Sequence, residues 1–195
     1  MAIDWRDRDR RLFEFIKKHP ATTKQLVKAG IYPDYRIAAR RMTRLRRRKR
    51  GEKPRIVGSI AMHDTGREAH IYCQHRPRSP KHEVLLTEQL LNFDLPIMDW
   101  IRGIETDTKY KPDAELGRLK VEYDTGTESR KQVLKQVRQY QDCKSIVLWV
   151  FNELNRFNWL QGVATTNTLM MLAGASELYD IQGNALGVDE LSKLT

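Results

Sequence analysis

Residues 33–50 read Pro-Asp-Tyr-Arg-Ile-Ala-Ala-Arg-Arg-Met-Thr-Arg-Leu-Arg-Arg-Arg-Lys-Arg. At 100° per residue, a helix over this stretch has an apolar face formed by Ile37, Ala38, Met42 and Leu45. The opposite face is basic and carries Arg36, Arg40 and Arg47. Pro33 at the first helical position, with Asp34 beside it, predicts where this helix begins. An amphipathic helix needs neighbours to cover its apolar face, and the flanking sequence supplies them.

Two further helices are predicted before the basic helix. Residues 5–18 show amphipathic spacing that ends before Pro20. Thr22 or Thr23 can cap a short second helix that runs to about Ala29, where Gly30 provides the stop. The basic helix is therefore the third of three helices that follow one another closely.

A hairpin is predicted after the basic helix. Residues 55–60 and 68–72 are strand-like, and the residues between them, 63–67, have the composition of a turn. The order helix, helix, basic helix, hairpin predicts a winged helix-turn-helix domain over residues 1–76. A proline-containing segment, residues 77–80, is the predicted linker to a second domain over residues 81–195.

The charge of the chain is concentrated in the predicted first domain and linker. Residues 1–80 contain 22 Lys and Arg against 8 Asp and Glu, a net charge of +14, whereas residues 81–195 contain 13 against 17, a net charge of −4. Such asymmetry indicates a module that binds a polyanion, joined to a module with another task. The sequence therefore predicts double-stranded DNA as the partner, with RNA or another polyanion as the alternative.

Arginine on the outer face of the third helix suits the major groove, because its planar guanidinium can contact guanine O6 and N7 together. Arg36 and Arg40 are the candidates for base contacts. Further cations should contact phosphates, give affinity and make binding depend steeply on salt. These candidates are Arg44, Arg47, Arg48, Arg50 and, in the predicted wing, Arg67.

The second half of the chain is predicted to be α/β. Residues 81–93 have helical periodicity, and a short strand is expected to begin near Ala114 and to turn at Gly117 into a second strand over residues 119–124. A helix to about Tyr140, capped by Thr127 or Ser129, and an apolar strand over residues 145–151 are expected to follow.

Three carboxylates are expected to converge in this second domain. Asp113 precedes the first strand, and Glu122 and Asp124 share one face of the second, because side chains repeat every two residues. Such a set suits a hard divalent cation, Mg²⁺ or Mn²⁺. The alternative is that each of the three is an ordinary turn or surface residue.

Two resemblances rest on these residues. Pro112-Asp113, then Glu122-x-Asp124, then Gln136-x-x-x-Tyr140 resembles the core of the PD-(D/E)XK nuclease superfamily, in its branch with a Q-x-x-x-Y helix. The combination with a winged helix, with His82 and with the segments KPDAEL, VEYDTGTES and KQVRQY resembles the replication-relaxation family of plasmid and mobile-element proteins. The resemblance implies a restriction-endonuclease-like second domain and a role in replication, DNA relaxation or mobilisation of such an element.

The sequence departs from the active nuclease pattern at Asp124. Active enzymes carry a lysine there, which orients the attacking water and stabilises charge in the transition state. Lys120 is the candidate substitute in a catalytic set with Asp113 and Glu122, and Lys131 or Lys135 of the following helix are the other options. The departure favours a nuclease-like domain that does not cleave DNA, and the alternatives are a metal-dependent endonuclease or nickase and a transcriptional repressor.

The expected surroundings of the protein follow from its composition. No apolar run approaches the ~20 residues that span a bilayer, and the N-terminus lacks the apolar stretch of a secretory signal, so a cytoplasmic location without membrane association is expected. The two cysteines, Cys73 and Cys143, are expected to be free thiols. Replication or transfer proteins are expected as further partners, and a homodimer remains an alternative.

Overall fold

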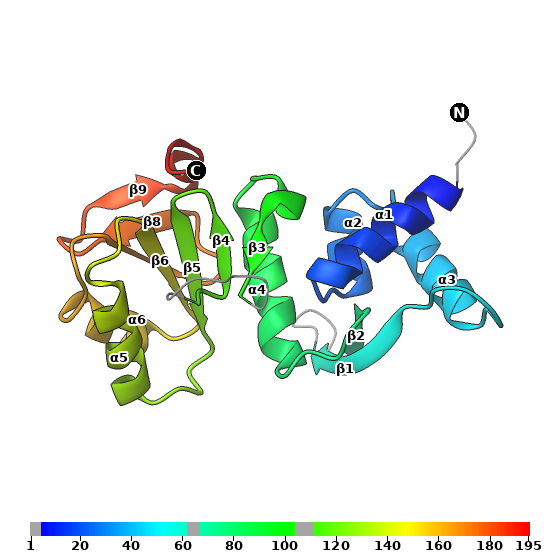
Figure 1. Cartoon of the computed structure of the whole chain (residues 1–195), viewed down its shortest axis with the longest axis horizontal. Helices are drawn as coiled ribbons and strands as arrows, with labels where there is room; N and C mark the ends of the chain where they lie inside the picture. Colours follow the sequence, from blue (N-terminus) through cyan, green and yellow to red (C-terminus); the bar gives the residue numbers. More distant parts are fainter. Residues whose placement is uncertain (1–4, 62–66, 104–110) are drawn as a thin grey trace. The chain divides into compact units, whose positions relative to one another are not determined.

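The computed structural model describes residues 5–61, 67–103 and 111–195. The chain divides into two compact units, Met1–Leu91 and Asn92–Thr195. Each unit contains helices and a sheet, so the fold is of the mixed α+β kind that the sequence predicts (Figure 1).

The first unit has its helices at both ends and a two-stranded sheet between them. Its elements are α1 (Trp5–Lys18), α2 (Thr23–Lys28), α3 (Tyr35–Arg46), β1 (Arg55–Ala61), β2 (Glu68–Cys73) and α4 (Pro80–Asn92). The bounds of α1 confirm the prediction for residues 5–18, and both predicted strands are present. The predicted turn at 63–67 lies, apart from Arg67, outside the described residues.

Side-chain caps define where two of these helices begin. Thr22 caps α2 in a capping box, in which its hydroxyl accepts from the Gln25 backbone N–H and the Gln25 side chain accepts from the Thr22 backbone N–H. Asp34 caps α3, because its carboxylate accepts from the Ile37 backbone N–H at 2.8 Å. Pro33 therefore precedes the cap, and the prediction that it is the first helical residue is wrong.

The strands β1 and β2 are antiparallel, with Ile56 opposite Tyr72 and an irregularity before Gly58. Ala21, between α1 and α2, forms a further antiparallel bridge to Tyr72. The helices are thus tied to the sheet by backbone hydrogen bonds. Their apolar faces form a core of fully buried side chains that includes Leu12, Ile16, Leu26, Ala38, Met42, Leu45 and Ile71.

The helix α4 belongs to the first unit, whereas the sequence analysis assigned residues 81–93 to the second. The Gln25 side-chain amide donates to the Val84 carbonyl at 2.8 Å, and Lys28 Nζ lies 2.6 Å from Glu88 Oε1. These contacts join α4 to α2 of the first unit. The boundary between the compact units therefore follows Leu91 and does not lie at 77–80.

The described strands of the second unit form one sheet in the order β3-β4-β5-β6-β7-β8-β9. The pairs β5–β6 and β6–β7 are parallel and the others antiparallel. The strands are β3 (Ile101–Arg102), β4 (Ala114–Leu116), β5 (Leu119–Asp124), β6 (Ile146–Phe151), β7 (Thr168–Leu172), β8 (Glu177–Asp180) and β9 (Ala185–Gly187). The helices are α5 (Arg130–Tyr140), α6 (Leu154–Gln161) and the 3-10 turns η1 (Ile97–Asp99) and η2 (Val188–Lys193).

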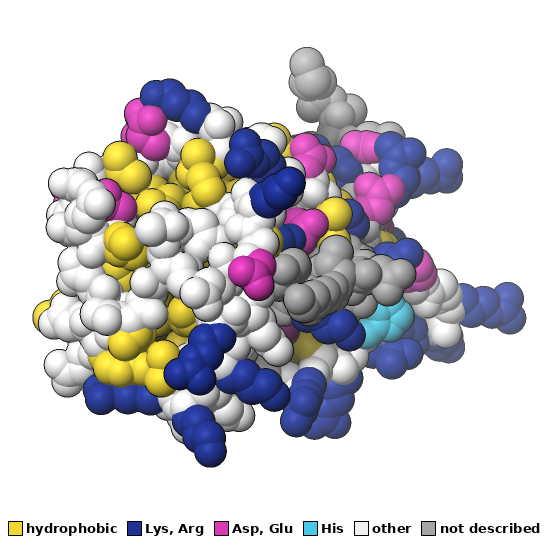
Figure 2. Space-filling view, turned by 60° about the vertical axis from the view of Figure 1, so that its left-hand side comes forward, with side chains coloured by type: hydrophobic (Ala, Val, Ile, Leu, Met, Phe, Trp, Pro, Cys, Tyr) yellow, Lys and Arg dark blue, Asp and Glu magenta, His cyan; other side chains and the backbone are white. Residues whose placement is uncertain are grey.

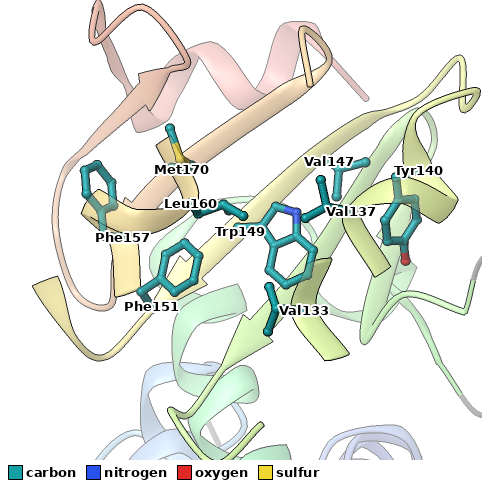
Figure 3. Packing of buried hydrophobic residues seen from close by; sticks show 9 residues of the cluster. All are labelled: Val133, Val137, Tyr140, Val147, Trp149, Phe151, Phe157, Leu160 and Met170. Atoms are coloured by element: carbon teal, nitrogen blue, oxygen red, sulfur yellow. The ribbon is translucent and has the colours of Figure 1, made fainter. Parts of the chain in front are cut away.

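The helices α5 and α6 connect the parallel strands and pack on one face of the sheet. Figure 3 shows the Trp149 ring within this core, beside Val133 and Val137 of α5. The parallel register aligns Glu122 with Trp149 and Trp149 with Met170, so alternate residues of β5, β6 and β7 point to this face. The face that carries Glu122 is therefore the face that α5 covers.

Most elements of the second unit agree with the sequence prediction. Ser129 caps α5 in a capping box with Gln132, and β5 and β6 lie where alternation and apolar content place them. The last two strands, β8 and β9, are not predicted, because they are short and lie in a turn-rich tail.

None of the described helices is long and apolar enough to cross a membrane. Cys73 is buried, Cys143 is half-buried, and neither forms a disulfide.

Candidate functional site

The outer face of α3 is a continuous basic surface. Asp34 and the apolar side chains of the helix fix its orientation, because Ala38, Met42 and Leu45 are fully buried. The side chains on the opposite face are exposed and spaced by three or four residues. This surface, called the α3 basic face below, consists of Arg36, Arg40, Arg44 and Arg47.

A buried ion pair anchors α3 to α1. Asp9 accepts two hydrogen bonds from Arg41, from Nε at 2.8 Å and from Nη2 at 2.6 Å, and both side chains are about nine-tenths buried. The Arg41 guanidinium also lies over the Trp5 ring, 4.9 Å from its centroid. The hydrogen bonds with Asp9 raise the pKa of Arg41. A bidentate ion pair of this kind fixes both the position of α3 and its rotation about its axis.

The other predicted phosphate contacts lie outside α3. Arg48 donates to Asp9 Oδ2 at 2.8 Å and is part of the anchoring network, so its guanidinium is not wholly available to a ligand. Arg50 and Arg67 are exposed. The helix ends at Arg46, and the basic run therefore continues from the helix into the following irregular segment.

Three charged side chains of β5 point to the face beneath α5, and each has a partner. Lys120, Glu122 and Asp124 alternate along the strand and are all 5% exposed. Lys120 forms an ion pair with Glu115 of the adjacent strand β4. Burial of a charge is costly unless the charge is paired. Each of these three buried side chains has a partner of its own.

Glu122 and Asp113 both lie near the Tyr140 hydroxyl. The Tyr140 hydroxyl donates to Glu122 Oε1 from the last turn of α5. Burial raises the pKa of Tyr140 far above its usual range, and the negative charges of Glu122 and Asp113 raise it further. Asp113 also accepts from the Tyr123 backbone N–H at 2.8 Å. Gln136 lies about one turn before Tyr140 and is half-buried.

Asp124, at the position of the expected lysine, has a different partner. Arg156 of α6 donates to Asp124 Oδ2 through Nε at 2.6 Å, and the Gly126 backbone N–H donates to Oδ1 at 2.8 Å. The Asp124 side chain is 2% exposed and that of Arg156 is 10% exposed. Asp124 is thus held in a buried ion pair, with partners other than those of Glu122.

The candidate substitutes for the missing lysine do not lie beside Asp113 and Glu122 as free cations. Lys120 shares the strand face of Glu122 but is paired with Glu115. Lys131 and Lys135 are exposed, because α5 turns Val133 and Val137 towards the sheet. Lys131 and Lys135 therefore point away from the sheet that carries the carboxylates, and this orientation does not support a role beside them.

The hydrogen-bond partners of the carboxylates bear on whether they could ligate a metal ion. A hard divalent cation needs several oxygen ligands, and Asp124 is neutralised by Arg156 while Glu122 accepts from Tyr140. The described residues contain no group of three His, Cys, Asp or Glu side chains placed to hold a metal ion. Asp124 and Glu122 are thus engaged by other side chains in the described conformation, and binding of Mg²⁺ or Mn²⁺ stays a prediction.

The partners of the buried charges were missed by the sequence analysis, although a signal was present. Asp9 lies on the buried side of α1, three residues before Leu12, and Arg41 lies on the apolar side of α3. Arg156 directly precedes Phe157 on the buried side of α6. A charged residue at an apolar position of a helix predicts a buried partner, but not which residue it is.

Comparisons of the chain with protein-family models, with characterised proteins and with solved structures found no significant match. The candidate function therefore rests on the residues and their geometry.

Proposed function

We propose that this protein binds double-stranded DNA through its first unit, which acts as a winged helix-turn-helix domain with α3 as the recognition helix. The observation that carries the proposal is the α3 basic face: four exposed arginines on one side of a helix whose other side is fully buried. The exposed side contains no carboxylate that would neutralise them within the helix.

The elements around α3 support this assignment. A helix of this kind fits the major groove, which is ~12 Å wide, and a following hairpin is in a position to contact the neighbouring backbone. The Asp9–Arg41 pair holds α3 rigidly, which base recognition requires. Arg36 and Arg40, in the first half of α3, are the proposed base-contacting residues, and Arg44, Arg47, Arg50 and Arg67 are the proposed phosphate contacts.

For the second unit we propose a nuclease-like fold that does not cleave DNA. The antiparallel pair β4–β5, the helix α5 and the parallel strand β6 follow one another in the order that a PD-(D/E)XK core has. The pairing of Asp124 with Arg156 and of Lys120 with Glu115 favours a structural role for these charges. Together the two units support a role in replication, relaxation or mobilisation of a plasmid or other mobile element, in the cytoplasm.

The test is selection of bound fragments from random duplex DNA, followed by affinity measurements on the selected site. Arg36→Ala and Arg40→Ala are each expected to cost ~1–3 kcal/mol on the selected site and to relax the sequence preference. Arg50→Ala is expected to weaken binding to all sequences alike, and Arg10→Ala, an exposed arginine of α1, is the control.

Two results would contradict the proposal. Failure of the wild-type chain to bind duplex DNA at low salt would remove the DNA-binding function itself. Equal effects of Arg36→Ala, Arg40→Ala and Arg50→Ala on every sequence would show that α3 is not the recognition helix.

A metal-dependent endonuclease is the second candidate, because the Asp113 carboxylate accepts from the Tyr123 backbone N–H at 2.8 Å and so lies beside the strand position of Glu122. Incubation of supercoiled plasmid with the protein and Mg²⁺ or Mn²⁺ separates the two candidates. Nicking that is lost in Asp113→Asn and Glu122→Gln would overturn the non-catalytic proposal. Absence of both nicking and calorimetric metal uptake would remove the endonuclease.

A further inference from the structure

The helix α5 carries an unpaired basic surface within a half of the chain that is acidic overall. Its sequence, RKQVLKQVRQY, contains four cations and no carboxylate, whereas residues 81–195 as a whole have a net charge of −4. Lys and Arg side chains gather along the lower edge of the face shown in Figure 2. The positive charge of the second unit is therefore concentrated in part on one helix.

Three of these cations form a stripe. Lys131, Lys135 and Arg138 follow one another at spacings of four and three residues, so they lie on the same side of α5. All three are exposed, and none has an ion pair with any carboxylate of the described residues. Arg130 is excluded from this α5 stripe, because its guanidinium lies 5.3 Å from the centroid of the Trp159 ring.

The opposite side of α5 is committed to the core. Val133 and Val137 are buried against Trp149 (Figure 3). The Tyr140 hydroxyl donates a hydrogen bond to Glu122. The helix is thus held in one orientation, with the α5 stripe directed to solvent. A charged surface on a rigid element presents its cations at fixed spacing to a ligand.

We propose that the α5 stripe binds the phosphate backbone of duplex DNA as a second contact, independent of base sequence. The inference rests on the proposed function, in which duplex DNA is already the partner of the first unit. From Lys131 to Arg138 the helix rises ~10 Å, a length over which a duplex presents about six phosphates. Three cations with no carboxylate between them complement that density of negative charge.

The chemistry of the stripe favours duplex DNA over other anionic partners. Single-stranded nucleic acid is bound largely by stacking on aromatic side chains, and the stripe has none. A membrane-binding helix offers an apolar face beside its basic one, but the apolar face of α5 is buried against the sheet. Protein interfaces need apolar anchors. The apolar side chain between the stripe residues, Leu134, is half-buried and offers little surface for such an anchor.

The experiment measures binding of the full chain to a labelled duplex of about 40 base pairs by fluorescence anisotropy, over a series of salt concentrations. The variant Lys131→Ala/Lys135→Ala removes two cations, and alanine retains the helix. The slope of log K against log salt is expected to become shallower by ~1.8, since each phosphate contact contributes ~0.9. The loss should be the same for the selected and a scrambled sequence.

The matched control is Lys111→Ala/Lys144→Ala, which removes the same charge from exposed positions outside α5. A slope that changes no more in the α5 variant than in this control would overturn the inference. So would an effect found only with a single-stranded probe or with vesicles containing phosphatidylserine. If the wild-type chain binds the duplex, Arg36→Ala weakens that binding and the α5 variant leaves the salt slope unchanged, then only this inference is overturned. Absence of wild-type binding would overturn the proposed function.

Discussion

Replacing Asp124 with asparagine tests whether this residue stabilises the fold or is available to a functional site. The Asp124 carboxylate accepts hydrogen bonds from Arg156 Nε at 2.6 Å and from the Gly126 backbone N–H at 2.8 Å. Asparagine retains the shape but removes the charge. The guanidinium of Arg156, 10% exposed, is then buried without a counter-charge.

The expected cost is that of breaking a buried ion pair from one side, ~3–5 kcal/mol. The second unit, Asn92–Thr195, has the size at which 1 kcal/mol corresponds to roughly 4–8 °C in melting temperature. Differential scanning calorimetry of the full chain, fitted with one transition for each unit, should therefore show one transition lowered by at least ~12 °C. Trp100, Trp149 and Trp159 lie in the second unit and Trp5 lies in the first, so tryptophan fluorescence mainly follows the transition of the second unit.

Two further variants control this result. Asp124→Leu/Arg156→Met replaces the pair with apolar side chains and should recover most of the lost stability, because neither charge is then left alone. Glu190→Gln breaks the exposed Lys193–Glu190 pair and should leave the transition unchanged. A loss below ~1 kcal/mol in Asp124→Asn would refute the reasoning, since Asp124 would then be a solvated carboxylate free to act in a site.

Two predictions concern the first unit. Asp9→Asn leaves Arg41 and Arg48 without their counter-charge, so it should lower the stability of this unit by ~3–5 kcal/mol and weaken binding to all DNA sequences; an unchanged calorimetric transition would contradict it. Burial raises the pKa of Tyr32 to about 12 from 10.0, so the folded chain keeps this proton between about pH 10 and 12 while the unfolded chain loses it. The free energy of unfolding is therefore unaffected by ionisation of this group below pH 10 and falls by up to roughly 3 kcal/mol as the pH rises to 12. The urea midpoint should fall less steeply with pH in Tyr32→Phe than in the wild type. Equal dependence of the two midpoints on pH would contradict this.

The helices and their caps were the most predictable features of the chain. The stop before Pro20, the Thr22 cap and the Ser129 cap depend on residues within four positions of one another, and all three are present in the structure. The third helix begins two residues later than predicted, at Tyr35 and not at Pro33. The carboxylate of Asp34 accepts from Ile37 only when Asp34 itself remains extended.

The candidate sites were predictable to the extent that they depend on periodicity. Helical spacing placed Arg36 and Arg40 opposite the apolar side of their helix, and strand alternation placed Glu122 and Asp124 on one face. The same spacing contains the α5 stripe, which the net charge of the second half concealed. A charge averaged over 115 residues does not reveal cations that one helix brings to a single surface.

The sequence by itself determined the elements, the faces of α3 and β5 and the separation of charge along the chain, because these depend on local spacing. Only the tertiary structure decided which charges are partnered. Asp124 meets Arg156 because β6 and its connections bring α6 over the end of β5, 32 residues further along the chain. In the first unit, contacts between distant elements likewise join Asp9 to Arg41 and hold α4 against α2. Such contacts depend on which faces of distant elements bury each other, and for this reason no local pattern specifies them.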